Sequence, residues 1–315
     1  MQVTKAVITA AGRGVRQYPT FDTVHRAMLP VVDRDGLTKP VLQIIAEEAF
    51  DCGIDELGIV CAPGDEPRYR QQFAAHADHL QTCHPGVDWA EDQLQRLTNI
   101  ANRTRFIVQE TAEGYGHAVW RAKEFVGDSA FLLLLSDHLY ISRTAARCAR
   151  QVVDLATAEE CAVSAVQATR EHLIHQYGTV AGKRVHDRPE VWVVEEIIEK
   201  PTLTLAELRL QAPGLRTGQY LCFFGMHVLT PTVFAVLDRM IARDAREGGQ
   251  FQLSPALNEL ARQEKYLALE TRGSRHNLGV KFGLIETQIA LAMSGVDRER
   301  MLSLILESMI RVEQA

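Results

Sequence analysis

Residues 6–19 read AVITAAGRGVRQYP, in which an apolar run is followed by two closely spaced glycines. A buried strand followed by Gly12 and Gly14 can bring backbone N–H groups close to a phosphate chain, because glycine tolerates positive φ and has no Cβ to block the approach. The pattern is G-x-G-x-x-R, without the third glycine of a dinucleotide loop or the Gly-Lys-Ser/Thr ending of a P-loop. The Arg16 guanidinium supplies a fork of donors suited to a pyrophosphate. We expect a polyphosphate site here, with an ordinary tight turn as the alternative.

Length and composition narrow the class of protein. The chain has 315 residues, enough to bury a large core as one α/β domain or as a domain with a smaller subdomain. Its net charge of −6 argues against a dedicated nucleic-acid binder. No early segment has the layout of a signal peptide and no apolar stretch is long enough to cross a bilayer, so we expect no membrane association. The six cysteines form no C-x-x-C pair, which is typical of reduced thiols in a cytoplasmic protein.

Apolar and helical segments alternate along the first half of the chain. We expect strands near residues 5–10, 57–62, 105–109 and 130–136, with helical stretches such as 41–49 between them. This alternation predicts an α/β fold with a Rossmann-like mixed, mainly parallel sheet flanked by helices. Ligands bind such sheets at the carboxyl ends of the strands, where Gly12 and Asp137 both lie.

The second half is less regular. Strands near residues 191–198, 219–229 and 266–270 are mixed with short helices. A final helix over 298–312 places an apolar stripe on one face, formed by Met301, Leu302, Ile305, Met309 and Val312. We expect this stripe to pack on the chain's own core, with a contact between subunits as the alternative.

Eight short motifs occur in order along the chain and resemble those of one family. Residues 12–19 (GRGVRQYP) follow the offsets of G-x-G-T-R-x-x-P, and residues 25–30 (HRAMLP) follow those of P-K-E-M-L-P without a gap. Residues 109–119 (QETAEGYGHAV) resemble Q-G-x-x-x-G-L-G-H-A-V, and the apolar run 132–137 resembles a strand that ends in P-D. The remaining matches are YGTV at 177–180, EKP at 199–201, FGM at 224–226 and QLSP at 252–255. The chain therefore resembles the sugar nucleotidyltransferases, and most closely the bacterial UTP:glucose-1-phosphate uridylyltransferases (UDP-glucose pyrophosphorylases).

The resemblance implies a reaction that needs alignment and charge rather than a covalent intermediate. A sugar 1-phosphate oxygen attacks the α-phosphorus of a nucleoside triphosphate, and pyrophosphate leaves in line. UTP and glucose 1-phosphate are the expected substrates, Mg²⁺ the expected cofactor, and a homodimer or homotetramer the expected assembly. The family also implies one domain over 1–315, with a mainly nucleotide-binding half at 1–190, a mainly sugar-binding half at 191–280 and C-terminal helices at 281–315.

Roles carry over residue by residue where the motifs match. The implied catalytic residues are Arg16, Arg26 and Asp137, and the implied metal ligands are Asp137 and Asn277. The residues implied to hold the nucleotide are Ala10, Ala11, Gly12, Gly14, Gln109 and Gly114. Those implied to hold the sugar phosphate are Gly178, Glu199 and Lys200. The Gln109 amide offers a donor and an acceptor to the imide edge of uracil or thymine, or else caps a loop. UTP is favoured over dTTP because the surrounding loop resembles the uridylyl branch. His117 is expected to orient that loop.

Three positions depart from the family pattern. Arg26 stands where the family has lysine, Asn277 where it has a metal-binding aspartate, and Gln250 where it commonly has a glutamate. Arginine is planar and bulkier than lysine, and asparagine removes one negative charge from a Mg²⁺ site. The first of two alternatives follows from these departures, and the second concerns the glycine loop alone. The first is a catalytically weakened homologue that binds nucleotide or nucleotide sugar as a sensor or regulatory subunit. The second is a Rossmann-type oxidoreductase, which detectable NAD(P) binding would support.

Overall fold

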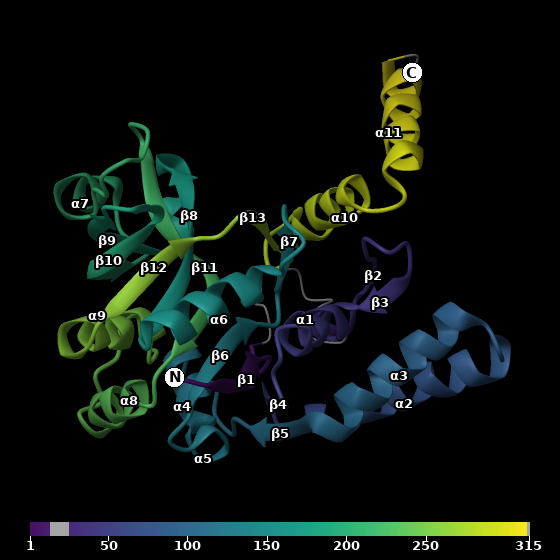
Figure 1. Cartoon of the computed structure of the whole chain (residues 1–315), viewed down its shortest axis with the longest axis horizontal. Coiled ribbons are helices and arrows are strands. Elements are labelled where there is room, and N and C mark those ends of the chain that lie inside the picture. The colour runs from purple at the N-terminus through teal and green to yellow at the C-terminus, as the bar shows by residue number, and fades with distance from the viewer. Residues whose placement is uncertain (13–24, 314–315) are drawn as a thin grey trace.

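The structure is a computed structural model that describes residues 1–12 and 25–313, with side chains described as far as residue 310. A nine-stranded mixed sheet forms its centre (Figure 1). The strands lie in the order β5 (Thr104–Val108), β4 (Glu56–Cys61), β1 (Val3–Thr9), β6 (Ala130–Leu135), β11 (Gln219–Leu229), β8 (Ala162–Arg170), β12 (Tyr266–Glu270), β10 (Arg188–Glu199) and β9 (Gly178–Val185). Every strand expected from the sequence is present, and the Rossmann-like α/β class is confirmed.

The first half of the chain builds the parallel part of this sheet. Strands β5, β4, β1 and β6 are all parallel, and Ile8 of β1 lies opposite Ile59 and Leu134. Strand β11 then runs antiparallel to both β6 and β8, and joins the second half of the chain to the first. Strand β6 is wholly apolar and β1 is buried from Ala6 onward, because both faces of a parallel sheet are covered by helices.

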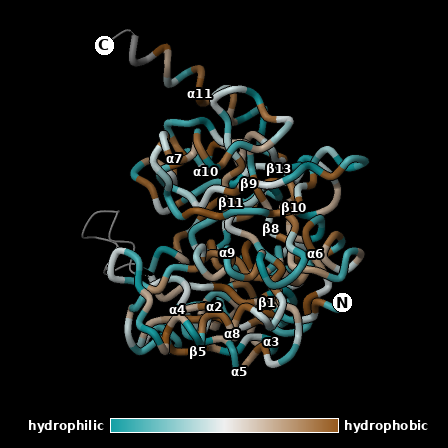
Figure 2. The backbone as a smooth tube through the Cα atoms, turned by 90° about the vertical axis from the view of Figure 1, so that its left-hand side faces the viewer, coloured by the Kyte–Doolittle hydropathy of each residue, from teal (hydrophilic) through white to brown (hydrophobic). Residues whose placement is uncertain are grey.

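Helices cover both faces of the sheet. Their bounds are α1 Val41–Phe50, α2 Asp65–Cys83, α3 Asp88–Arg103, α4 Tyr115–Arg121, α5 Lys123–Val126, α6 Cys148–Glu159, α7 Leu203–Arg209, α8 Thr232–Ala242, α9 Leu253–Gln263, α10 Gly283–Ser294 and α11 Arg298–Glu313, with 3₁₀ turns η2 Arg26–Met28 and η3 Glu171–Gln176. Ile8 packs in one core cluster with α1 and α6, whereas Val7 packs in a second with α4, α8 and α9. Alternate strand residues point to opposite faces, so each face has its own core. Figure 2 shows hydrophobic residues concentrated on these inner segments.

Two small sheets lie beside the central one. Strands β2 (Pro30–Val32) and β3 (Thr38–Pro40) form a hairpin. Strand β7 (His138–Ser142) pairs antiparallel with β13 (Gly273–Asn277), and this register places Asn277 opposite His138. The β7–β13 pairing therefore brings together segments that lie far apart in the sequence.

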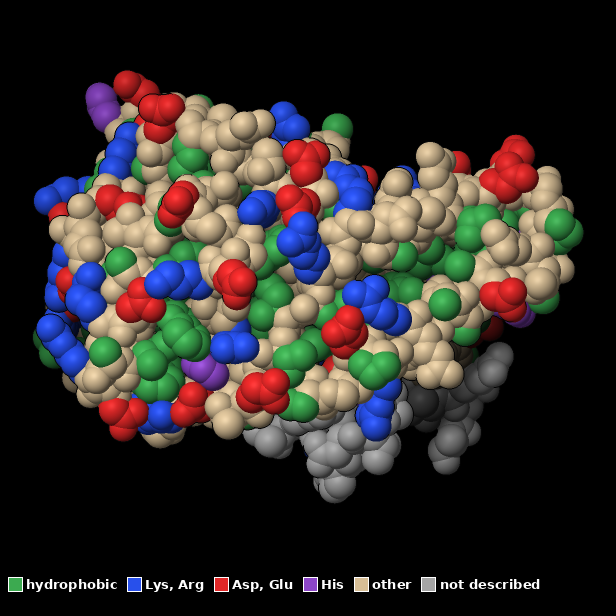
Figure 3. All heavy atoms as spheres, turned by 90° about the horizontal axis from the view of Figure 1, so that it is seen from below, with side chains coloured by type: hydrophobic (Ala, Val, Ile, Leu, Met, Phe, Trp, Pro, Cys, Tyr) green, Lys and Arg blue, Asp and Glu red, His purple; other side chains and the backbone are tan. Residues whose placement is uncertain are grey.

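Two helical features extend from the body. Helices α2 and α3 form a long hairpin at one side of the molecule (Figure 1). Helix α11 lies above this hairpin in Figure 1 and leaves the body in both ribbon and tube views (Figures 1 and 2). On the face drawn in Figure 3, acidic and basic side chains are interspersed. Across the described residues, no helix is both long and apolar enough for a membrane span.

The expectation that the stripe of the final helix packs on the chain's own core is wrong for its outer part. Met301, Leu302 and Ile305 are half-buried beside α10, but Met309 is 59% exposed. The Val312 side chain lies outside the described residues. The helix turns away from the sheet after α10, so only its first turns have core within reach.

Candidate active site

One cavity of about 590 Å³ opens at the carboxyl ends of β1, β5 and β6. Strands β1 and β6 are neighbours, with Thr9 opposite Leu135, so the segments that follow them meet at one edge of the sheet. The cavity is lined by most of the residues expected from the sequence: Ala11, Gly12, Arg26, Gln109, Gly114, Asp137, Gly178, Glu199, Lys200 and Asn277. Gly14 and Arg16 fall outside the described residues. Gln250, the third departure from the family pattern, also lines the cavity.

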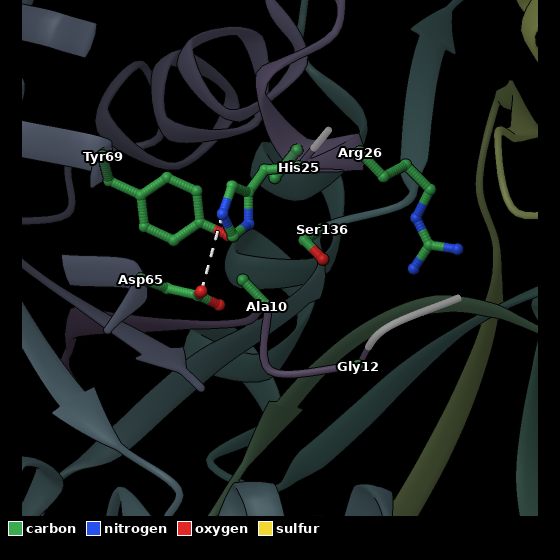
Figure 4. A pocket seen from close by; sticks show the side chains of 8 residues that line it. Ala10, Gly12, His25, Arg26, Asp65, Tyr69 and Ser136 are labelled. Atoms are coloured by element: carbon green, nitrogen blue, oxygen red, sulfur yellow. Dashed lines mark ion pairs between the residues drawn. The ribbon is translucent and has the colours of Figure 1, made fainter. Parts of the chain in front are cut away.

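A small adjoining pocket lies between β1, η2 and α2, and Ala10 lines it (Figure 4). His25 anchors its rim, because its Nε2 lies 3.5 Å from Asp65 Oδ1 and its ring meets Tyr69 edge-on at 5.2 Å between centroids. The Arg26 side chain extends away from this group and also lines the larger cavity (Figure 4). The start of α2 therefore fixes the backbone from which Arg26 reaches into the site.

Gly12 does not adopt the positive φ that its position after a strand suggested. A Cβ placed on Gly12 would find no described atom within 4 Å. Among the described residues, neither a left-handed conformation nor a close contact requires glycine at position 12.

Asp137 is the centre of a polar cluster just beyond the carboxyl end of β6. Arg26 Nη2 lies 3.1 Å from Asp137 Oδ2, and His138 Nδ1 lies 2.8 Å from Asp137 Oδ1. Burial lowers the pKa of His138, while the Asp137 carboxylate opposes that shift. The His138 imidazole is therefore neutral near pH 7 and donates its Nδ1–H to the carboxylate. The β7–β13 pairing adds Asn277, whose Oδ1 accepts a 2.7 Å hydrogen bond from Gly279 N.

The donor set at this cluster suits a divalent cation that is shared with a phosphate. A Cβ on Gly279 would lie 2.7 Å from Asp137 Oδ2 and 2.9 Å from Asn277 Oδ1, so these two oxygens converge over Gly279. Magnesium in phosphate-handling enzymes takes one or two carboxylates and completes its shell with substrate phosphates and water. Within residues 1–12 and 25–313, no group of three His, Cys, Asp or Glu side chains is arranged to hold a metal ion. The residues therefore fit Mg²⁺ brought with a nucleotide.

Gln109 lies at the end of β5 in a tightly ordered loop. Its buried amide Nε2 donates to Gly114 O at 3.3 Å and lies 3.0 Å from His117 Nδ1. Burial lowers the pKa of His117, so its ring is neutral. His117 Nε2 lies 3.5 Å from Glu113 Oε2 and carries the hydrogen, which leaves Nδ1 as the acceptor for Gln109. Both Gln109 hydrogens are thus used within the protein. Only Oε1 is left for a ligand, which corrects the expectation that the amide offers a donor as well.

Gly114 must be glycine for a conformational and a steric reason. Its φ is +115°, in the region that residues with a side chain rarely adopt. A Cβ there would lie 2.7 Å from Phe251 O, which also accepts a hydrogen bond from Gly116 N. The loop carrying Gln109 is therefore clamped against the segment before α9.

The opposite end of the cavity is formed where β9 begins and β10 ends. Gly178 and Glu199 are paired across these strands. Glu199 Oε2 accepts a 2.5 Å hydrogen bond from Ser254 Oγ, and Glu199 Oε1 lies 3.3 Å from Lys200 Nζ. A Cβ on Gly178 would come within 2.7 Å of Ser254 Oγ and 3.1 Å of Glu199 Oε2. Glycine at 178 keeps this carboxylate in place and leaves its flank open.

Three residues at the site had no assigned role from the sequence. Ser254 and His138 orient the two carboxylates, and the Arg275 guanidinium lies 3.8 Å from the Tyr177 ring centroid while it donates to Phe223 O. All three line the cavity. Ser254 stood within a matched motif, but its partner depends on how α9 packs on β10. No sequence signal pointed to Arg275, because the β7–β13 pairing positions it.

A mixed sheet with helices on both faces, and a cavity at the strand ends lined by cations and two separate carboxylates, defines an α/β protein with a charged ligand cavity. The chain belongs to the nucleotidyl transferase family, whose sequence model matches residues 5–274. This match confirms the family resemblance drawn from the motifs. It also argues against the alternative that the chain is a Rossmann-type oxidoreductase.

Curated relatives and solved structures agree with the family. A UTP–glucose-1-phosphate uridylyltransferase of Bacillus subtilis (strain 168) is 29% identical over 315 residues, which cover 99% of each chain. A second B. subtilis enzyme of that name, YngB, is 30% identical over 319 residues, covering 99% of this chain and 97% of the relative. A crystal structure of UDP-glucose pyrophosphorylase complexed with UDP-glucose has a TM-score of 0.74 at 25% identity, covering 92% of this chain and 98% of the other. The Acinetobacter baumanii UDP-glucose pyrophosphorylase has the same fold, with a TM-score of 0.77 at 23% identity over 97% of this chain and 99% of the other.

Proposed function

We propose that the protein transfers a uridylyl group from UTP to glucose 1-phosphate, forming UDP-glucose and pyrophosphate. The observation that carries this proposal is a single cavity lined by both the Arg26–Asp137 pair and the Glu199–Lys200 pair. Its volume of about 590 Å³ is in the range of small-molecule sites. Two phosphorylated substrates repel each other, so the protein must hold both in line and supply positive charge between them.

The residues divide by what they can bind. Arg26 faces the α-phosphate and offsets the charge that builds on it, while Arg16 and the glycines at 12 and 14 hold the β- and γ-phosphates beside Ala10 and Ala11. Lys200 holds the phosphate of the sugar, and Glu199 accepts hydrogen bonds from sugar hydroxyls beside the Gly178 backbone. When bound, Mg²⁺ on Asp137 and the Asn277 carbonyl supplies further charge neutralisation.

The base is selected at Gln109 and Gly114. Gln109 Oε1 accepts from the N3–H of uracil, and this acceptor disfavours cytosine, whose N3 is itself an acceptor. The hydrogen bonds from Gln109 Nε2 to Gly114 O and to His117 hold the amide in one orientation, which leaves Oε1 for the base. This arrangement supports a uracil or thymine nucleotide, with UTP as our choice over dTTP.

The test is pyrophosphate release by the purified protein. UTP, dTTP, CTP and ATP are each supplied with Mg²⁺ and glucose 1-phosphate, and galactose 1-phosphate is tested with the best nucleotide. We expect release with UTP and glucose 1-phosphate and little with CTP. Absence of release with every pair, together with absence of UDP-glucose binding by calorimetry, would refute the proposal.

A catalytically weakened nucleotide-sugar sensor is the second candidate, favoured by one observation. Asn277 places a neutral oxygen over Gly279 where a second carboxylate would strengthen metal binding. In that case UDP-glucose binds but turnover is near zero, and the double variant Arg26→Lys with Asn277→Asp raises turnover. Wild-type turnover equal to that of the double variant would exclude the sensor.

The proposal also covers the oligomeric state, the substrate that each half of the chain binds, and the cellular location. The homodimer or homotetramer is supported by the apolar residues that α10 and α11 expose, among them Phe282, Ile285 and Met309 at 64%, 60% and 59%. We assign residues 1–190 mainly to the nucleotide and 191–280 mainly to the sugar, with 281–315 as C-terminal helices. The six free cysteines support a reducing cytoplasm. Sedimentation of the full chain, alone and with Met309→Glu, measures the assembly.

A further inference from the structure

The oxygens that would receive a divalent cation are each engaged by a donor of the protein. Asp137 Oδ2 pairs with Arg26 Nη2 at 3.1 Å, and Asp137 Oδ1 pairs with His138 Nδ1 at 2.8 Å. Asn277 Oδ1 accepts from Gly279 N at 2.7 Å. Of these donors only Arg26 carries a full positive charge and sits on a side chain long enough to swing away. A cation that arrives at Asp137 therefore competes first of all with Arg26.

Arg26 has unused capacity for an anion. Its Nε is buried and has no hydrogen-bond partner among the described residues. A buried guanidinium nitrogen without an acceptor is unfavourable, and phosphate oxygens are acceptors that match the fork of Nε and Nη. The side chain lines both the small pocket and the main cavity, so a bound triphosphate lies within its reach.

The backbone around Arg26 is held while its side chain can move. His25 is anchored by Asp65, by Arg68 Nη1 at 3.2 Å and by the edge of the Tyr69 ring. Figure 4 shows Asp65 and Tyr69 on one side of His25 and the Arg26 guanidinium on the other. Exchange of Arg26 between Asp137 and a phosphate therefore needs only side-chain rotation.

We propose that Arg26 acts as a resident cation at Asp137, and that a nucleotide phosphate draws it away and so opens the carboxylate to the metal. The inference rests on the proposed function, since it takes the incoming anion to be a nucleotide phosphate. Nucleotide and divalent cation then bind with positive coupling, and by linkage each strengthens the other by the same factor. Arginine suits this exchange because its planar fork can pair with a carboxylate or a phosphate bidentately, which the point charge of lysine cannot do.

The exchange is tested by measuring each ligand alone on the full chain. Mn²⁺ is titrated without nucleotide and its free concentration is followed by electron paramagnetic resonance; UDP is titrated in EDTA by calorimetry. Arg26→Gln is expected to tighten Mn²⁺ binding at least about tenfold, because it removes a cation beside the carboxylate. The same variant is expected to weaken UDP binding by about tenfold or more, because a charge-assisted contact to phosphate is lost. The Mn²⁺ and UDP affinities of Arg26→Lys are each expected to lie between those of the wild type and of Arg26→Gln.

Two controls separate this exchange from other causes. Arg150→Gln removes the same charge from α6, where Arg150 pairs with Asp154, and should change neither affinity. Adding Asp137→Asn to Arg26→Gln should abolish the gained Mn²⁺ binding, and thermal unfolding confirms that each variant is folded. Mn²⁺ affinity that is unchanged or weaker in Arg26→Gln would overturn the inference. A wild type that binds no uridine nucleotide, with Mn²⁺ binding still gained in Arg26→Gln, would instead refute the proposed function and leave the resident cation standing.

Discussion

Ser254 Oγ donates a 2.5 Å hydrogen bond to Glu199 Oε2 and so ties the first turn of α9 to the last residue of β10. Ser254 is buried, and Glu199 is the carboxylate we assign to the sugar hydroxyls. Without this bond the carboxylate gains rotamer freedom that sugar binding must remove. We expect Ser254→Ala to raise the KM for glucose 1-phosphate about tenfold, the effect of one hydrogen bond to a charged group, with a smaller change in kcat.

Ser254→Thr is the matched control for that experiment. Threonine keeps the hydroxyl, so the KM of this variant should stay near the wild-type value. A KM for Ser254→Ala equal to that of wild type would show that Ser254 does not position Glu199.

Two tyrosines with different hydrogen bonding predict opposite stability effects. The Tyr115 hydroxyl is buried with no hydrogen-bond partner among the described residues, whereas Tyr140 OH donates to Gly225 O at 2.7 Å. Tyr115→Phe removes an unsatisfied polar group and should raise the free energy of unfolding by about 1 kcal/mol. Tyr140→Phe leaves the Gly225 carbonyl unpaired and should lower it by about 1–3 kcal/mol. Urea unfolding measures both; effects of the same sign would contradict the assignment.

His227 makes stability fall at acidic pH. Burial lowers its pKa from 6.5 to about 3, and its Nδ1 lies 2.5 Å from Ser164 Oγ, a hydroxyl it shares with Tyr266. Between these two pKa values the unfolded chain binds a proton that the folded protein does not, so the stabilisation is complete above about pH 6.5 and is lost as the pH falls. From pH 6.5 to about pH 5 this residue alone should cost about 2 kcal/mol.

The variant His227→Gln isolates that contribution. Its free energy of unfolding should depend less on pH over the same interval, by about 2 kcal/mol, even where its stability at neutral pH is lower. Burial also lowers the pKa of His117, His138 and His276, so some acid destabilisation remains. Parallel pH profiles for the variant and the wild type would rule His227 out as a source.

Gln109 is expected to serve both the loop and the base. Gln109→Glu removes the two N–H donors that reach Gly114 O and His117, and places a negative charge against a carbonyl oxygen. We expect UTP binding to weaken at least about tenfold and the free energy of unfolding to fall by about 1–3 kcal/mol. Calorimetry with UTP and thermal unfolding measure the two effects. Unaltered UTP affinity would remove Gln109 from the base site.

Local sequence determined the parallel half of the sheet and the position of the candidate site. The short apolar runs that become β1 and β6 favour buried strands, and the polar or glycine residues that follow them come at their carboxyl ends. Gly12 and Asp137 could therefore be assigned to one edge before any contact was known. The motif at residues 109–119 likewise placed Gln109 and Gly114 in one loop, because their separation along the chain is short.

Only the tertiary structure decided what those side chains meet. The pairing of β7 with β13 puts Asn277 and Arg275 beside Asp137 and Tyr177, and the packing of α9 supplies Ser254 to Glu199. The hydrogen bonds around Gln109 left it one acceptor rather than a donor and an acceptor, and α11 left the body of the protein instead of covering it. Short-range patterns specify which backbone a segment prefers, whereas contacts between segments that are distant in the sequence depend on strand register and helix packing, which no local pattern encodes.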